Sequence, residues 1–154
     1  LCTRFLGKKS HNVMKPLTLS PPKSFESSGS ALIDSFNDSE RNLRFALGKV
    51  RAEKMKKPFD TENRILPVEY IKAANTVIEM ENPMEAEKYL NRYRLENLET
   101  LRPMDNFSED YIFYYGLKLK LLLRIRQFDT KAGEEAYRNI YNSILNGDRL
   151  EAKQ

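Results

Sequence analysis

Residues 108–147, SEDYIFYYGLKLKLLLRIRQFDTKAGEEAYRNIYNSILNG, decide the fold that this sequence predicts. Ser108 comes directly before Glu109 and Asp110, so a hydroxyl can cap the first backbone N–H groups while carboxylates face the positive end of the helix dipole. Apolar side chains then recur three and four residues apart, which is the spacing of one helix face. They are Tyr111, Ile112, Tyr115, Leu119, Leu122 and Leu123. A helix is therefore predicted to begin just after Ser108.

A second helix is predicted after a short turn at residues 127–130, where Asp129 or Thr130 can serve as its N-cap. Its apolar stripe is equally regular and consists of Ala136, Tyr137, Ile140, Tyr141, Ile144 and Leu145. Gly147 predicts the end of this helix, because glycine tolerates the left-handed conformation that closes many helices. Residues 108–147 thus predict a helical hairpin.

Two further segments upstream also have helical periodicity. Residues 31–57 predict a long helix that ends before Pro58, because proline disfavours helical geometry in the residue before it. Residues 67–102 predict an earlier hairpin that begins at Pro67 and turns at Asn82 and Pro83. The fold class expected is all-α, with about five helices arranged as hairpins in one helical domain over residues 31–147.

The two ends of the chain lack this periodicity. Residues 1–30 contain three prolines, two glycines and eight Ser or Thr, with few apolar residues at regular spacing. Such a segment buries too little apolar surface to offset its chain entropy. Residues 1–30 are therefore expected to form an extended or disordered basic arm, and residues 148–154 a polar tail.

Positive charge is concentrated in the front of the chain. Residues 1–57 carry 12 Lys and Arg against five Asp and Glu, whereas residues 58–154 carry 14 against 17. The helix at 31–57 is a cationic amphipathic helix, and a basic front half of this kind is typical of contact with an anionic surface. The residues expected to contact RNA backbone or another anion are Arg4, Lys8, Lys9, Lys15, Arg41, Arg44, Lys49, Arg51, Lys54, Lys56 and Lys57.

The first 30 residues also indicate a compartment. They are basic and rich in serine, and no acidic residue precedes Glu26, which is typical of an organelle transit region. We therefore expect a mitochondrial matrix protein; the alternative is an ordinary disordered basic arm in another reducing, intracellular compartment. The single cysteine, Cys2, allows no internal disulfide. No stretch approaches the roughly 18 apolar residues of a membrane-spanning helix, so no span is expected.

The residue types that catalysis usually requires are missing from the predicted helices. The single histidine, His11, and Cys2 both lie in the basic arm, away from any rigid scaffold. No Gly-rich phosphate loop and no Asp-rich calcium loop is present. Glu109, Asp110 and the pair Glu134 and Glu135 are explained as first-turn carboxylates. We expect no enzyme activity, no cofactor, no metal site and no small-molecule substrate.

Tyrosine is unusually frequent, with eight residues and no tryptophan. Tyrosine suits a half-buried position, because its ring can pack in a core while its hydroxyl reaches water. It also anchors protein interfaces. Core lining and a tyrosine-rich interface therefore both remain open. The interface residues expected under the second interpretation are Tyr89, Tyr93, Tyr114, Tyr137 and Tyr141.

These features predict a non-catalytic structural subunit of a large multi-subunit assembly. The form expected is a mitochondrial ribosomal component that contacts RNA backbone through its basic front half and protein neighbours through its hairpins. The alternative is a protein-only adaptor or assembly factor of a mitochondrial complex.

Overall fold

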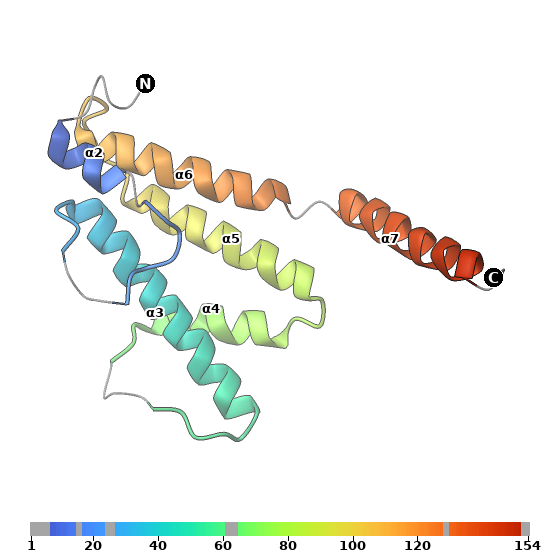
Figure 1. Cartoon of the computed structure of the whole chain (residues 1–154). Coiled ribbons are helices and arrows are strands. Elements are labelled where there is room, and N and C mark those ends of the chain that lie inside the picture. Colours follow the sequence, from blue (N-terminus) through green and yellow to red (C-terminus); the bar gives the residue numbers. More distant parts are fainter. Residues whose placement is uncertain (1–6, 15–16, 24–26, 61–64, 128–129, 152–154) are drawn as a thin grey trace. The chain divides into compact units, whose positions relative to one another are not determined.

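The computed structural model describes residues 7–14, 17–23, 27–60, 65–127 and 130–151. Over these residues the fold is all-α and contains no strand (Figure 1), as predicted. The helices are α2 (Lys8–Met14), α3 (Ala31–Lys54), α4 (Val68–Glu79), α5 (Pro83–Thr100), α6 (Glu109–Gln127) and α7 (Thr130–Glu151). The chain divides into two units, residues 1–123 and residues 124–154, and each is described by itself.

Three helices begin at caps that the sequence contains. Ser108 Oγ accepts a hydrogen bond from the backbone N–H of Tyr111 (3.2 Å), and α6 begins at the next residue, as predicted. Asn82 caps α5 through the N–H of Met84 (2.9 Å), with Pro83 as the first helical residue. Ser30 caps α3 by accepting from the N–H of Ile33 (3.4 Å). The local signals therefore fix where these helices start.

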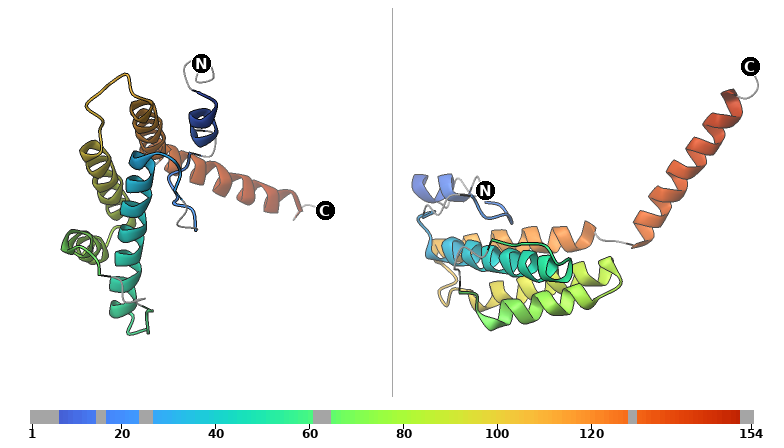
Figure 2. Two further views of the ribbon diagram at one scale, coloured as in Figure 1. Left: turned by 90° about the vertical axis from the view of Figure 1, so that its left-hand side faces the viewer. Right: turned by 90° about the horizontal axis from the view of Figure 1, so that it is seen from below.

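The first unit has two apolar cores, and both lie along α3 and α5. The α6 core joins the first half of α3, the end of α5, one face of α6 and part of the N-terminal segment. It consists of Leu17, Leu32, Ile33, Phe36, Leu98, Phe113, Tyr114, Leu117 and Leu121. Figures 1 and 2 show the start of α3 beside α6. One long helix, α3, thus contributes to both cores.

The second core, which we call the α4 core, joins the second half of α3 to α4 and α5. Its buried residues are Leu43, Ala46, Val50, Leu66, Tyr70, Ala73, Ala74, Val77 and Leu90. Helix α4 packs on both α3 and α5, so the predicted hairpin at residues 67–102 is formed by α4 and α5. The small residues Ala46, Ala73 and Ala74 are almost fully buried and allow the helices to approach closely.

The N-terminal arm carries more structure than its composition indicates. Its described part contains the short helix α2, which adds a sixth helix to the five predicted. Leu17 is only 4% exposed, and a Cβ built on Gly116 of α6 would lie 2.7 Å from Met14 Cε and 3.0 Å from Leu17 Cδ2. A glycine at position 116 therefore gives room for the arm to pack on α6.

The last helix is longer than predicted. The sequence places its end at Gly147, whereas α7 continues to Glu151 and takes in part of the predicted polar tail. A glycine inside a helix costs only about 1 kcal/mol, so it does not force an end. Helix α7 begins at Thr130, which puts Glu134 and Glu135 after its first turn. The predicted packing of residues 108–147 as a hairpin joins the two units and stays a prediction.

Candidate functional site

A buried ion pair lies between the two cores. Glu40 of α3 is 3% exposed, and its two carboxylate oxygens accept hydrogen bonds from Arg94 Nε of α5 at 2.9 and 3.0 Å. Arg44 Nε also donates to Glu40, at 3.3 Å, and Arg94 Nη1 donates to the amide oxygen of Asn91 at 3.4 Å. The carboxylate is thus saturated with donors from its own chain. This arrangement ties α3 to α5.

A second polar cluster joins α5 to α6 near the surface. The hydroxyl of Tyr114 donates to Glu99 Oε2 (2.7 Å), and Lys118 Nζ lies 2.6 Å from Glu99 Oε1 and 3.2 Å from the Tyr114 oxygen. The hydrogen bond from Lys118 lowers the pKa of Glu99, and the same bond raises the pKa of Lys118. Burial raises the pKa of Tyr114. A tyrosine that holds its proton more firmly than usual is a poor general base, so the cluster fits a structural role.

The first-turn carboxylates of α6 do more than complement the helix dipole. Glu109 Oε2 accepts a hydrogen bond from Ser10 Oγ (2.5 Å), and Asp110 Oδ1 accepts one from Ser30 Oγ (2.7 Å). Ser10 and Ser30 are both buried. Asp110 therefore connects the start of α6 to the cap of α3, while Glu109 holds α2. Sequence reasoning missed both contacts, because no local pattern links residues about 80 to 100 positions apart.

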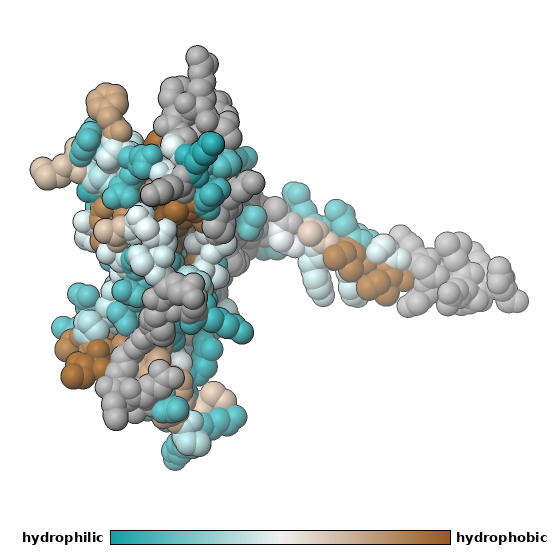
Figure 3. All heavy atoms as spheres, turned by 60° about the vertical axis from the view of Figure 1, so that its left-hand side comes forward, coloured by the Kyte–Doolittle hydropathy of each residue, from teal (hydrophilic) through white to brown (hydrophobic). Residues whose placement is uncertain are grey.

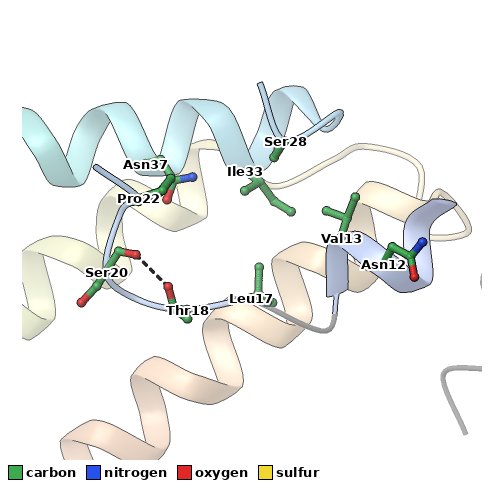
Figure 4. Close-up of a pocket in the computed structure, with 9 residues that line it drawn as sticks. All are labelled: Asn12, Val13, Leu17, Thr18, Ser20, Pro22, Ser28, Ile33 and Asn37. Carbon is green, nitrogen blue, oxygen red and sulfur yellow. Dashed lines mark hydrogen bonds between the residues drawn. The ribbon is translucent and has the colours of Figure 1, made fainter. Parts of the chain in front are cut away.

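One cavity of about 390 Å³ opens between the N-terminal segment and the start of α3. Figure 4 shows Val13, Leu17 and Ile33 around it, with polar side chains such as Asn12 and Asn37 at its edge. Thr18 Oγ1 donates to the backbone carbonyl of Ser20 (2.7 Å) beside it. Its volume falls in the range of small-molecule sites. No charged or nucleophilic side chain apart from neutral hydroxyls lines it, so its lining does not indicate catalysis.

The cationic residues of α3 and of the segment directly after it divide into two groups. Helix α3 ends at Lys54, so the helix predicted to reach residue 57 stops three residues earlier. Arg41 donates to Asp38 (2.7 Å) and to the backbone carbonyl of Pro22 (3.2 Å), and Arg44 contacts Glu40 and Ser20. These two guanidinium groups therefore form hydrogen bonds within their own chain. Towards the other end of α3 lies a set that we call the basic end, of which Lys49 is partly buried and the rest are exposed. It consists of Lys49, Arg51, Lys54, Lys56 and Lys57.

The other expected anion contacts lie in the arm. Lys8 is exposed at the start of α2. Arg4, Lys15 and the side chain of Lys9 lie outside the described part of the chain. Among the described residues of this set, the five cations of the basic end lie within nine positions of one another in the sequence.

The expected interface tyrosines fall into three environments. Tyr114 is 2% exposed in the α6 core, so it cannot contact a partner in this structure. Tyr89 and Tyr93 are partly buried against the α4 core, and burial raises the pKa of Tyr93 to about 12. Only Tyr137 and Tyr141 are well exposed, at 69% and 52%, and their rings stack with centroids 6.1 Å apart.

The exposed tyrosines belong to a continuous apolar stripe on α7. Ile140 and Ile144 complete it at 61% and 57% exposure, and Figure 3 shows the hydrophobic side chains of this helix at its surface. Asn139 and Asn142 lie on the other side of α7 and are exposed as well. Described by itself, α7 is strongly amphipathic, and no described residue of its own unit covers its apolar face.

Two other kinds of site have no candidate among the described residues. The described part of the chain holds no group of three or more His, Cys, Asp or Glu side chains that could bind a metal ion. Among those residues no helix is long and apolar enough to cross a membrane.

Comparison with known families gives one match. Residues 59–148, more than half of the chain, match the model of a family described as a protein of unknown function, DUF2764. The chain belongs to the DUF2764 family. The match covers α4, α5, α6 and most of α7, so the exposed stripe of α7 lies inside the DUF2764 region while α2 and α3 precede it. No curated protein and no solved structure matches this DUF2764 protein.

Proposed function

We propose that this DUF2764 protein is a non-catalytic structural subunit of a larger assembly, which it joins through protein contacts. The observation that supports this proposal is the apolar stripe of α7, whose four side chains are each more than half exposed. Exposed apolar groups that cluster on one face favour an interaction surface, because burying a side chain of this size contributes about 1.5–3 kcal/mol. Tyrosines at its centre are typical anchors of such contacts.

A second candidate function is contact with RNA backbone, and the basic end of α3 favours it. Arg51, Lys56 and Lys57 are exposed there, and Lys54 Nζ donates to the backbone carbonyl of Ile78 (2.9 Å). A compact group of cations binds phosphates without reading base sequence. The more specific proposal, a mitochondrial ribosomal subunit, rests in addition on the transit-like composition of residues 1–30. Of the five basic residues in this segment, Arg4 and Lys15 lie outside the described residues.

The test is native purification of the tagged full chain from cells, with and without ribonuclease, followed by sedimentation and mass spectrometry. We expect the chain to sediment with large particles. The variant I140D/I144D should release it, because two carboxylates in the stripe oppose burial. The matched control N139D/N142D adds the same charge on the other side of α7 and should leave sedimentation unchanged.

The two candidate functions give different results in this experiment. If R51Q/K56Q/K57Q or ribonuclease releases the chain while I140D/I144D does not, the RNA interpretation replaces protein docking. If the native full chain sediments as a free monomer, the proposal that it is an assembly subunit is wrong.

A further inference from the structure

The cavity beside the start of α3 is formed within the first unit of the chain. The described residues that line it all lie between Asn12 and Asn37, on α2, on the segment after it and on the first two turns of α3. Its volume is about 390 Å³. An apolar cavity of about 150 Å³ already holds a benzene ring, so this one has room for a molecule of about two fused rings.

One buried polar side chain in the lining has no partner. Asn37 is 8% exposed, and its carboxamide forms no hydrogen bond with any residue that the structure describes. Figure 4 shows this carboxamide at the cavity, whose middle is bordered by the apolar side chains of Val13, Leu17 and Ile33. A buried amide without a partner costs free energy, because it has given up water and gained no hydrogen bond. A ligand that pairs with Asn37 would remove this cost.

The other polar side chains of the lining are satisfied in other ways. Thr18 Oγ1 and Ser28 Oγ donate to backbone carbonyls at 2.7 and 3.2 Å. Ser20 Oγ accepts a hydrogen bond at 3.2 Å, and Asn12 is exposed. Asn37 is thus left as the buried group that can recognise a ligand, and its carboxamide offers N–H donors and a carbonyl acceptor side by side.

The charges near the cavity favour a neutral ligand. Arg41 and Arg44 reach lining residues at 3.2 Å, but each also forms an ion pair with an acidic residue of α3. Asp34 accepts hydrogen bonds from the N–H of Ser28 (2.8 Å) and from Ser27 Oγ (2.6 Å). No charged side chain is among the described residues of the lining. A charged ligand would therefore lose its hydration without meeting an unpaired counter-charge.

We infer that this cavity binds a neutral, mainly apolar small molecule that presents an N–H and a C=O side by side, as an amide or a lactam does. Its apolar body contacts Val13, Leu17 and Ile33, and its amide edge pairs with the carboxamide of Asn37. The sequence predicts no small-molecule substrate, and this inference adds a bound ligand without a reaction. It does not depend on the proposed function, whose supporting stripe lies on α7.

The experiment titrates the purified full chain with carbostyril, a fluorescent and neutral two-ring lactam, and follows the fluorescence of the probe. The matched probe is N-methylcarbostyril, which has the same rings and carbonyl but no N–H. We expect carbostyril to bind saturably, at one site per chain. The methylated probe should bind roughly tenfold more weakly, as expected for the loss of one buried hydrogen bond.

Variants of the chain locate the bound probe. N37L keeps the branched shape of the side chain but removes the amide, so it should weaken carbostyril roughly tenfold and bind both probes equally. V13F fills part of the cavity and should weaken both probes. N75L makes the same exchange at an exposed position of α4 and should bind carbostyril as tightly as the parent does. Circular dichroism should show the same helical signal for all three variants.

The stability of N37L separates a ligand site from a structural amide. Because an unpaired buried amide stabilises nothing, N37L should have a urea midpoint equal to or above that of the parent. A lower midpoint would show that Asn37 already has a partner within the chain, and the inference would then be wrong.

Four binding results would also overturn the inference. Equal binding of both probes to the parent would show that the amide edge is not recognised. Binding of naphthoate as tight as that of carbostyril would show that the site selects an anion. Unchanged binding in V13F would place the probe elsewhere, and the absence of saturable carbostyril binding would show that the cavity does not take such a ligand. None of these results affects the sedimentation test of the proposed function.

Discussion

The buried pair of Glu40 and Arg94 gives the sharpest test of how this fold is held together. The side chain of Glu40 is 2% exposed and that of Arg94 is 11% exposed, so neither charge can recover its hydration if its partner is removed. Removing one member of a buried ion pair costs about 3–5 kcal/mol. With a urea m-value of about 2 kcal/mol/M, E40L should lower the unfolding midpoint by about 2 M.

The double variant separates the pair from its surroundings. E40L/R94M replaces both charges with apolar side chains, and such replacements are often neutral or stabilising. We therefore expect the double variant to recover most of the stability that E40L loses, with a coupling free energy of about 3 kcal/mol. R94M alone should cost less than E40L if Arg44, 3.3 Å from the Glu40 carboxylate, partly compensates it.

The assay is urea unfolding of the full chain, followed by circular dichroism at 222 nm. D38N is the matched control, because Asp38 pairs with Arg41 at a side-chain exposure of 65% and exposed pairs contribute about 0–1 kcal/mol. The reasoning would be refuted if E40L lowered the free energy of unfolding by less than about 1 kcal/mol. It would also be refuted if the loss of stability in E40L/R94M equalled the sum of the losses in the two single variants.

Four further variants test the contacts of α6 and its neighbours. S30A removes the cap of α3 and a donor to α6, and should lower the urea midpoint by an amount equivalent to about 1–2 kcal/mol at unchanged m-value. The lowered pKa of Glu99 means that its stabilisation is present above its ordinary pKa of 4.5 and is lost as the pH falls through the lower folded value. E99Q should therefore flatten the loss of stability in urea titrations below pH 4.5. The raised pKa of Lys118 means that its stabilisation is fully present below its ordinary pKa of 10.5 and is lost as the pH rises through the higher folded value. K118M should therefore lower stability at neutral pH and flatten the loss of stability above pH 10.5. G116L should displace Leu17 from α6, which limited proteolysis of residues 17–23 would detect as faster cleavage while the helical signal persists.

Much of the secondary structure could be predicted because its signals are local. The hydroxyl of Ser108 and the Asn82-Pro83 pair mark helix starts within three residues of the groups that they satisfy. The three-and-four spacing of apolar residues likewise depends on one turn of helix. The end of α7 was predicted less well, because Gly147 permits a helix to end but does not require it.

The candidate site was less predictable. Arg41 and Arg44 are three residues apart, as are Arg51 and Lys54 of the basic end. The sequence does not show that the two guanidinium groups of Arg41 and Arg44 contact Asp38, Glu40, Ser20 and the carbonyl of Pro22. Tyr114 resembles Tyr115 in sequence, yet one is 2% exposed and the other 59%. A residue's type and spacing do not show which neighbour from a distant segment lies beside it.

By itself, the sequence determined the all-α class, the position of most helices, the hairpin of α4 and α5, and the concentration of positive charge in the front of the chain. The tertiary structure decided which of two apolar faces of α6 is buried and where Glu40 finds Arg94. It also decided that the arm packs on Gly116. The physical reason is range: caps and periodicity act within one or two turns, whereas burial depends on contacts between segments up to about 100 residues apart.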